Sequence, residues 1–391
     1  MKIRLNILFE LLKREIRIIL KDKDIFMVIL IAPLFYSFFY GSIYLNKSEN
    51  SIPFAVVDYD NSISSQKLIR MLDATSMIEV KEIISDPRRA QIELEAGNIS
   101  GYLLVPKNFE SSIKSKTGVV LNSYLNTTRF LVSNDLNKAV NETVAAFNKS
   151  LTLKYYYTKG INQEAAQTYL EPVATDIRSM FNTTDSYGDF LVPAILILIL
   201  QQTLFFGLAE SIAKENEFNT LRDYFSLAKN KINLIIHGKS IFYLVISSAY
   251  ALFFFTIVYS VFNVPFNGSA LVFASITLLL LLTVIYYSLF VASFFKRKIL
   301  ALQFLTLTSY PIFLISGYSW RLDSMPLLVK WIANLIPSTP FYSAFVRIVQ
   351  MGAGFNDIIP EIVHLLILFA VSYLALYFRI IAMKKSFSSD L

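Results

Sequence analysis

Six long stretches without a charged residue constrain this chain more than any other feature of its sequence. They are 25–45, 190–209, 241–262, 271–295, 299–319 and 362–378. Most of them reach the roughly 20 residues that a helix needs to cross a bilayer core of about 30 Å, and the last is near the lower limit. A water-soluble domain has no use for six such stretches. The sequence therefore predicts a polytopic α-helical membrane protein with six transmembrane helices.

The basic residues are placed where the predicted spans end. The chain has 36 Lys and Arg against 29 Asp and Glu. Seven of the basic residues precede the first span, and Lys296-Arg297-Lys298 fill the turn between the fourth and fifth spans. Because cytoplasmic loops carry such excesses, we expect both termini and the segment 210–240 to lie in the cytoplasm. The basic excess then reflects membrane topology, and no nucleic-acid partner is expected.

The segment 46–189, between the first two spans, has the size and pattern of a small domain. Strands are predicted at 54–57, 77–84, 101–105 and 118–124, and helices at 64–73, 87–97 and 136–157. The polar stretch 158–189 is expected to be a connector. With 17 acidic and 15 basic residues the segment is slightly acidic, which favours an extracytoplasmic α/β domain.

Two further segments are apolar without being long enough to span. Residues 1–24 form a basic amphipathic pattern that predicts a helix along the cytoplasmic interface, and span one follows at 25–45. Within 190–391, which holds the other five spans, the region of about 325–352 contains apolar stretches that suit re-entrant or interfacial helices. A cytoplasmic helix is expected at about 213–228.

Few residues of the spans carry chemistry. His364 is the one ionisable candidate, and we expect it to be packed or interfacial rather than a proton carrier. Gln201 and Gln202 lie in the second span, where hydrogen bonding between helices is expected and contact with a transported molecule is the alternative. The absence of Cys excludes disulfides and thiolate metal sites.

Two apparent motifs are better explained by local structure. Gly238-Lys239-Ser240 resembles the end of a phosphate-binding loop, but Asn233 stands where that loop needs Gly. Asp58 and Asp60 form a carboxylate pair in a predicted turn, where Asp is favoured for bonding to the backbone. The sequence therefore predicts no cofactor, metal or catalytic site in this chain.

The cytoplasmic segment 213–227 is the remaining candidate site. Leu221, Tyr224 and Phe225 fall on one face of a helix, with Glu215 and Glu217 elsewhere. Such a helix either docks a partner protein or rests on the membrane, and the pattern alone leaves both open.

Motifs in this segment and elsewhere resemble one known family. Glu215-x-Glu217-x-x-Thr220-Leu221 is similar to the E-x-E-x-G-T-L segment of ATP-binding-cassette type-2 transport permeases, with Asn219 where that family has Gly. Asn tolerates the left-handed backbone that Gly supplies. The other motifs are Gly238-Lys239, Lys23-Asp24 followed by Pro33, Ser316-Gly317-Tyr318, Met325-Pro326, Ile336-Pro337, Gly352-Ala353-Gly354, Val56-Val57-Asp58-x-Asp60-Asn61-Ser62 and Gly101-Tyr102-Leu103-Leu104-Val105-Pro106 with Phe109. They occur in the family's order over essentially the whole chain, and the last two resemble bacterial exporters with a large domain after span one. The resemblance implies a multi-pass protein of the bacterial inner membrane.

The resemblance implies a function. Two permease subunits, identical or sister proteins, would pair with two separate ATPase subunits that bind ATP. The helix 215–227 would couple the two, and the residues implied in ATPase coupling are Glu215, Glu217, Asn219, Thr220, Leu221 and Tyr224. The helix 3–20 would lie beside it, and a periplasmic adaptor is a further expected partner.

The cargo is not given by the sequence. Aromatic residues make up 15% of the chain, which fits an apolar or amphiphilic cargo but also fits contact with lipid. Two other classes of function stay open at this point. One is a membrane-anchored scaffold or receptor that binds a ligand without transport, and the other is a proton-coupled antiporter.

Overall fold

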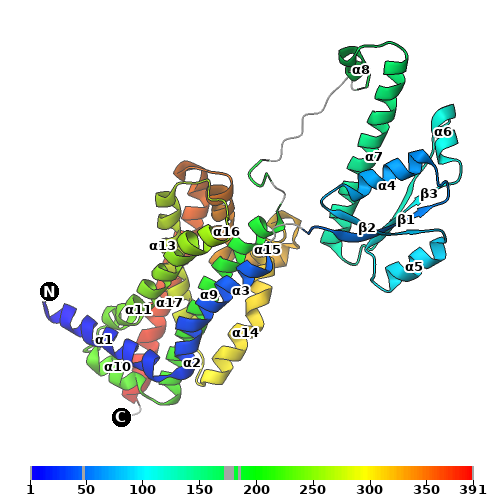
Figure 1. Ribbon diagram of the computed structural model, residues 1–391. Helices are drawn as coiled ribbons and strands as arrows, with labels where there is room; N and C mark the ends of the chain where they lie inside the picture. The colour runs from blue at the N-terminus through cyan, green and yellow to red at the C-terminus, as the bar shows by residue number, and fades with distance from the viewer. Residues whose placement is uncertain (1, 46–48, 171–179, 184–185, 390–391) are drawn as a thin grey trace. The chain divides into compact units, whose positions relative to one another are not determined.

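The computed structural model describes residues 2–45, 49–170, 180–183 and 186–389. These residues divide into two compact units, one of Ser48–Arg178 and one of Met1–Lys47 with Ser179–Leu391. We describe each unit by itself (Figure 1).

The unit Ser48–Arg178 contains one sheet of four strands. Its elements are β1 (Ile52–Asp58), α4 (Ile63–Asp73), β2 (Ile78–Ile84), α5 (Pro87–Glu95), β3 (Gly101–Val105), α6 (Phe109–Ser115), β4 (Asn122–Leu125), α7 (Phe130–Thr158) and α8 (Gln163–Leu170). The strand order is β2-β1-β3-β4. Strand β1 pairs in parallel with β2 and β3, while β4 is antiparallel to β3. Residues from α4, α6 and α7 form the core on one face of the sheet, and α5 packs on the other (Figure 1).

Most elements expected in this unit are present. The strands expected at 54–57, 77–84 and 101–105 are β1, β2 and β3, and the three expected helices are α4, α5 and α7. The strand expected over 118–124 is wrong in its first half, since β4 begins at Asn122. Gly118 has a positive φ of 74°, and Val119 and Leu121 pack against the apolar core instead of pairing along β3.

The connector expected at 158–189 also needs correction. Helix α8 occupies Gln163–Leu170 within it, and 171–179 and 184–185 lie outside the described residues. Ala166 of α8 is fully buried. Because the buried residue is an Ala, the helix has only a weak apolar pattern in the sequence.

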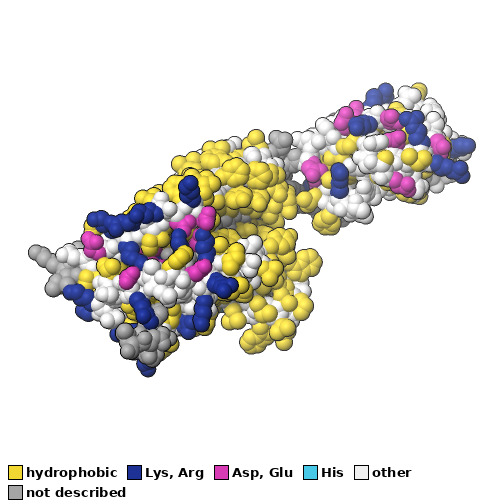
Figure 2. Space-filling view, turned by 90° about the horizontal axis from the view of Figure 1, so that it is seen from below, with side chains coloured by type: hydrophobic (Ala, Val, Ile, Leu, Met, Phe, Trp, Pro, Cys, Tyr) yellow, Lys and Arg dark blue, Asp and Glu magenta, His cyan; other side chains and the backbone are white. Residues whose placement is uncertain are grey.

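The other unit holds six helical segments long and apolar enough to cross a membrane. They are Lys23–Ile43, Tyr187–Glu217, Ile232–Val261, Ala270–Ala292, Lys298–Ile315 and Phe355–Lys385, called spans one to six below. Span one is built from α2 (Lys23–Phe26), η1 (Met27–Ile31) and α3 (Ala32–Ile43), and span three from α11 (Ile232–Phe253), η2 (Phe254–Val258) and α12 (Tyr259–Val261). Spans two, four and five are α9 (Tyr187–Glu217), α13 (Ala270–Ala292) and α14 (Lys298–Ile315). Span six consists of η5 (Phe355–Ile358) and α17 (Ile359–Ser389). Hydrophobic side chains cover a broad area of this unit next to one region where charged side chains gather (Figure 2), as expected of a helical membrane protein.

Helix α9 is the centre of this unit. In an apolar window of 18 residues, 72% of the residues of α9 are buried, whereas only 17% are buried in the corresponding window of α14. Helix α9 packs against α3, α11, α13 and α14. Gly207 of α9 allows the approach of span one, since a Cβ there would lie 2.7 Å from Cδ1 of Ile29.

The region of about 325–352 forms two different short helices. Helix α15 (Leu327–Asn334) exposes Leu327 and Trp331, whereas α16 (Ser338–Phe345), continued by η4 (Val346–Gln350), is buried in the bundle. A short η3 turn (Leu322–Ser324) precedes them. His364 Nε2 lies 2.8 Å from the carbonyl oxygen of Asn334, so it packs against the end of α15.

Candidate functional site

The predicted coupling segment lies at the end of the bundle that carries α1 (Lys2–Lys21), α10 (Leu221–Leu227) and the C-terminal part of α17 (Figure 1). We call it the charged end. Lys, Arg, Asp and Glu gather there next to the hydrophobic area (Figure 2).

The segment 215–227 is not one helix, so that prediction is wrong. Helix α9 continues to Glu217, and α10 begins at Leu221. Between them Asn219 has a φ of +55°, in the left-handed region. Asn adopts this conformation more readily than most residues, which confirms the backbone expected of Asn219 and makes 218–220 a tight turn. We call 218–220 the coupling turn.

Helix α10 turns its apolar face inward. Leu221, Tyr224 and Phe225 are buried, so these residues form neither an exposed docking face nor a face that rests on the membrane, the two alternatives that the sequence pattern left open. The outward side of the segment consists of Arg222, Asp223, Ser226 and Leu227 of α10 together with Glu217, Phe218 and Asn219. Phe218, in the coupling turn, is 64% exposed.

A buried cluster of charges fixes α9 to α1 and α11. Lys239 Nζ of α11 donates to Glu15 Oε1 of α1 at 2.8 Å and to Ser211 Oγ of α9 at 2.7 Å. The same ammonium group lies 3.5 Å from Glu215 Oε2, and Arg14 donates to the other oxygen of Glu215. Two positive and two negative groups therefore balance at the meeting point of three helices, and we call these four side chains the buried ion cluster.

The geometry of the cluster explains its electrostatics. Glu15 is fully buried, and Lys239 and Glu215 are each 3% exposed. Burial raises the pKa of the Glu15 carboxyl, because the charged form loses its water, although Lys239 opposes the shift. Charges at such positions are costly unless each has a partner.

The coupling turn is attached directly to this cluster. Arg14 also donates to the carbonyl oxygen of Thr220 at 3.3 Å. Its guanidinium carbon lies 5.0 Å from the centre of the Tyr224 ring, and Lys239 Nζ lies 5.3 Å from the same ring. Both distances suit cation–π contact, so Tyr224 seats α10 on the two cations, and burial raises its pKa well above the usual range.

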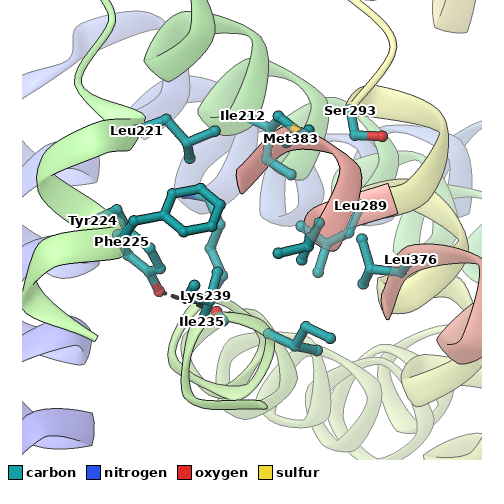
Figure 3. A pocket seen from close by; sticks show the side chains of 12 residues that line it. Ile212, Leu221, Tyr224, Phe225, Ile235, Lys239, Leu289, Ser293, Leu376 and Met383 are labelled. Atoms are coloured by element: carbon teal, nitrogen blue, oxygen red, sulfur yellow. Dashed lines mark hydrogen bonds between the residues drawn. The ribbon is translucent and has the colours of Figure 1, made fainter. Parts of the chain in front are cut away.

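Close packing of α10 depends on Gly238. A Cβ at this position would lie 2.6 Å from Cδ1 of Leu11 and 2.9 Å from the Tyr224 hydroxyl. That hydroxyl donates to the carbonyl oxygen of Ile235 at 3.4 Å (Figure 3). Gly238-Lys239-Ser240 is therefore helical and buried in α11, as the mismatch with a phosphate-binding loop predicted.

A cavity and a groove lie near the residues on which α10 packs. A small, mainly apolar cavity of about 30 Å³ lies beneath it, where residues of α9, α10, α11, α13 and α17 meet (Figure 3). On the other side an open groove of about 410 Å³ runs between α1 and the end of α9, with Phe218 and Thr220 on its wall. The coupling turn is thus approachable from outside the protein.

Glu217 is held differently from Glu215. Its Oε2 accepts a hydrogen bond from the backbone N–H of Lys298, the first residue of α14, at 3.0 Å. The Lys298 ammonium group contacts Asp24 at 2.8 Å and also pairs with the buried Glu210. The two acidic residues of the predicted motif therefore tie α9 to different helices, Glu215 to α1 and α11, and Glu217 to α14.

The nearest arrangement to a metal site among the described residues is formed by Asp22, Asp24 and Glu210. Their carboxylate oxygens lie within 4.8 Å of one another. However, Lys214 pairs with Asp22, and Lys298 pairs with the other two. Each of the three carboxylates therefore has a lysine partner, which accounts for the cluster without a metal ion.

The predicted pathway residues differ from each other. Gln202 Oε1 accepts a hydrogen bond from Ser309 Oγ of α14 at 2.9 Å, which confirms a bond between helices for this residue. Gln201 is 2% exposed, and the Nε2 atoms of both glutamines have no hydrogen-bond partner among the described residues. Contact of either with a transported molecule stays a prediction.

The Asp58 and Asp60 pair is structural. Asp58 accepts hydrogen bonds from the N–H groups of Asp60 and Asn61 at 2.9 and 3.0 Å. It also accepts one from the Ser65 hydroxyl at 2.6 Å. These bonds close the turn after β1, as the sequence predicted.

Sequence reasoning missed Arg14 and Glu15 as members of the site. They looked like parts of a basic amphipathic helix, and their partners lie about 200 residues further along the chain. The one available signal was an acidic residue on the same side of α1 as apolar positions such as Leu11 and Leu8.

Comparison with known proteins gives a consistent result. The family model described as ABC-2 family transporter protein matches residues 23–378. The "Probable multidrug ABC transporter permease YbhS" of Escherichia coli (strain K12) is 23% identical over 379 residues, covering 92% of this chain and 91% of that protein. The "Linearmycin resistance permease protein LnrN" of Bacillus subtilis (strain 168) is 23% identical over 385 residues, covering 92% and 96%. The "Inner membrane transport permease YhhJ" of Escherichia coli (strain K12) is 23% identical over 368 residues, covering 92% of each.

Proposed function

The chain belongs to the ABC-2 family of transporter proteins, and we propose that its exporter activity is driven through the coupling turn 218–220 and the outer side of α10. It is a permease subunit of an ABC exporter, without catalytic activity of its own, and the ATPase is a separate subunit. The scaffold and antiporter alternatives are therefore set aside. We propose that ATP binds only in that partner and that this chain needs no cofactor.

One observation carries the proposed place of coupling. Phe218 is exposed at a turn whose two flanking helices are fixed to the rest of the bundle. An exposed aromatic side chain on such a rigid support suits a protein interface, where aromatic anchors contribute much of the binding energy. A partner that pushes on this turn moves α1, α9, α10 and α11 together, because the buried ion cluster connects them.

This proposal changes the roles of the residues in the predicted motif. Leu221 and Tyr224 support α10 from within, and Glu215 belongs to the buried ion cluster. Phe218 and Asn219, with Arg222 and Leu227, are then the residues that meet the ATPase.

The membrane placement is also proposed. Lys296-Arg297-Lys298 and the basic residues of α1 belong to the charged end, so we place this end, with both termini, in the cytoplasm of a bacterial cell. The sheet unit Ser48–Arg178 then lies outside the cytoplasm, where an adaptor protein is a candidate partner. Helix α15 exposes Leu327, Leu328 and Trp331. It then lies at the interface between water and lipid on the non-cytoplasmic face of the same membrane.

The cargo and the second subunit are proposed from the names of the relatives and from the exposed face of α14. The names of the relatives mention multidrug transport and linearmycin resistance, which fits an apolar or amphiphilic cargo here. Helix α14 is the least covered span, with exposed Leu307 and Tyr310. This face is available to a second permease subunit, identical or a sister protein.

The test is co-purification of the ATPase with permease variants. Phe218→Asp places a charge at the centre of the proposed interface, and we expect ATPase retention to fall by about tenfold or more, in line with the loss of an interface anchor. Phe130→Asp is the matched control, since Phe130 is 71% exposed and lies in the sheet unit. Equal retention by the two variants would refute the proposed interface.

A further inference from the structure

Helix α14 begins without a cap of its own. Arg297 occupies the N-cap position and makes no side-chain hydrogen bond to the first turn. Unpaired N–H groups at a helix start are normally satisfied by an acceptor from the N-cap side chain. Here the acceptor comes from a distant part of the chain, because Glu217 Oε2 binds the N–H of Lys298 at 3.0 Å.

The neighbouring residue of α9 holds the turn that leads into α14. Asn216 Nδ2 donates to the carbonyl oxygen of Phe295 at 3.0 Å. Two consecutive residues at the end of α9 therefore bind both sides of the turn between spans four and five. A negative charge at a helix N-terminus is favourable in addition to the hydrogen bond.

Span five is the span that such a link can move most easily. With 17% of its apolar window buried, it is the least buried of the six spans among the described residues. Its start is held by polar bonds from Glu217, Asp24 and Glu210. Displacing the end of α9 therefore pulls on the start of α14 through these bonds.

Glu217 also immediately precedes the coupling turn. Phe218, at the proposed ATPase interface, is the next residue. We propose that Glu217 is a positioning residue that transmits motion of the coupling turn to span five by capping α14, and is not itself a contact with the ATPase. This inference rests on the proposed function of the turn.

The experiment uses the full permease with its ATPase in proteoliposomes. Glu217→Ala removes the acceptor, and Glu217→Gln keeps a neutral one of similar size. Loss of a helix cap of about 1 kcal/mol changes a two-state equilibrium about fivefold, so we expect transport per ATP hydrolysed to fall about fivefold in the Ala variant and less in the Gln variant. ATPase retention is expected to be unchanged in both. Glu10→Ala is the matched control, because Glu10 is an exposed acid on α1.

A spectroscopic readout separates positioning from general stability. The chain has no Cys, so Leu300→Cys gives one site for a spin label on α14, where the native side chain is 50% exposed. In the permease alone we expect Glu217→Ala to increase the mobility of this label, with Glu217→Gln intermediate. With the ATPase present, the change in label mobility on adding ATP is expected to be lost in the Ala variant.

The possible failures are distinguishable. If the mobility of the label and the transport yield per ATP are the same in Glu217→Ala and in the unsubstituted permease, the inference is wrong while the proposed interface stands. If Glu217→Ala lowers ATPase retention as Phe218→Asp does, Glu217 is a docking contact and the inference is also wrong. If Phe218→Asp retains the ATPase, the proposed interface fails, whereas the label in the permease alone still tests whether Glu217 caps α14.

Discussion

The buried ion cluster makes one strong prediction about stability. Lys239→Met removes the ammonium group that Glu15 and Ser211 both contact, while keeping a long apolar side chain in its place. The variant leaves one positive group, Arg14, with two buried carboxylates. The site then has a net negative charge in a place that excludes water.

The size of the effect follows from the distances. With an effective dielectric constant of about 20, charges 2.8 Å apart, as in Lys239 and Glu15, attract by roughly 6 kcal/mol, and charges 3.5 Å apart by roughly 5 kcal/mol. Desolvation of the ions offsets much of this attraction, and removing one partner of a buried pair costs about 3–5 kcal/mol in practice. We expect Lys239→Met to lower the free energy of unfolding by this amount.

The matched double variant tests the reasoning. Glu15→Gln with Lys239→Met removes one charge of each sign and leaves the pair of Arg14 and Glu215 intact. We expect it to be more stable than Lys239→Met alone, because neutrality is restored. The assay is detergent-induced unfolding of the purified permease, followed by circular dichroism, for both single variants and the double. A double variant whose loss equals the sum of the two single losses would refute the account of the cluster.

The same variants have a predicted dependence on pH. The pKa of Glu15 in the folded protein is raised above its unfolded value. Such a group contributes stability that is present below the unfolded pKa and is lost as the pH rises through the folded pKa. Lys239 lowers the pKa of Glu15 in the unsubstituted protein, so Lys239→Met raises it further, and Glu15 takes up a proton on folding over a wider range of pH. The penalty of Lys239→Met should therefore be smaller at pH 5 than at pH 8, whereas the double variant, which lacks the Glu15 carboxyl, should show less of this change.

Three further substitutions test local features of the site and of the spans. Asn219→Val should destabilise the coupling turn by about 1–2 kcal/mol, because a β-branched residue is strained at a φ of +55°. Asn219→Gly should be tolerated, and unfolding curves of the two variants measure the difference. Gly238→Val should lower the free energy of unfolding by about 1–3 kcal/mol, because the new side chain overpacks against Leu11. It should also reduce the stimulation of the partner ATPase by the permease. A stability equal to that of the original chain would contradict the close contact. Ser309→Ala removes the donor to Gln202 and should lower the free energy of unfolding by about 0.6 kcal/mol. A double-mutant cycle with Gln202→Leu measures this interaction energy.

The spans were predictable because their signal is local. A run of apolar residues long enough to cross a membrane identifies itself without knowledge of its neighbours, and all six expected spans have helical counterparts. The left-handed turn at Asn219 was predictable for a similar reason, since a short polar side chain tolerates that backbone.

The ends of the spans and the faces of short helices were not predictable in this way. Span two continues past the apolar run to Glu217, because Glu210, Glu215 and Lys214 find partners on other helices. The inward orientation of α10 likewise depends on Arg14 and Lys239, which are remote in sequence. A single sequence shows charges near a span end but not which of them pair.

The most direct test of the central claim is the protection of the coupling turn by the ATPase. Phe218→Cys provides the one thiol of the chain, and a membrane-impermeant maleimide can be applied to inside-out vesicles and to intact spheroplasts. We predict labelling in inside-out vesicles, loss of labelling when the ATPase is bound, and no labelling in spheroplasts. Labelling that is equal with and without the ATPase, or that occurs from the outside, would contradict the claim that an ATPase drives this permease at the coupling turn.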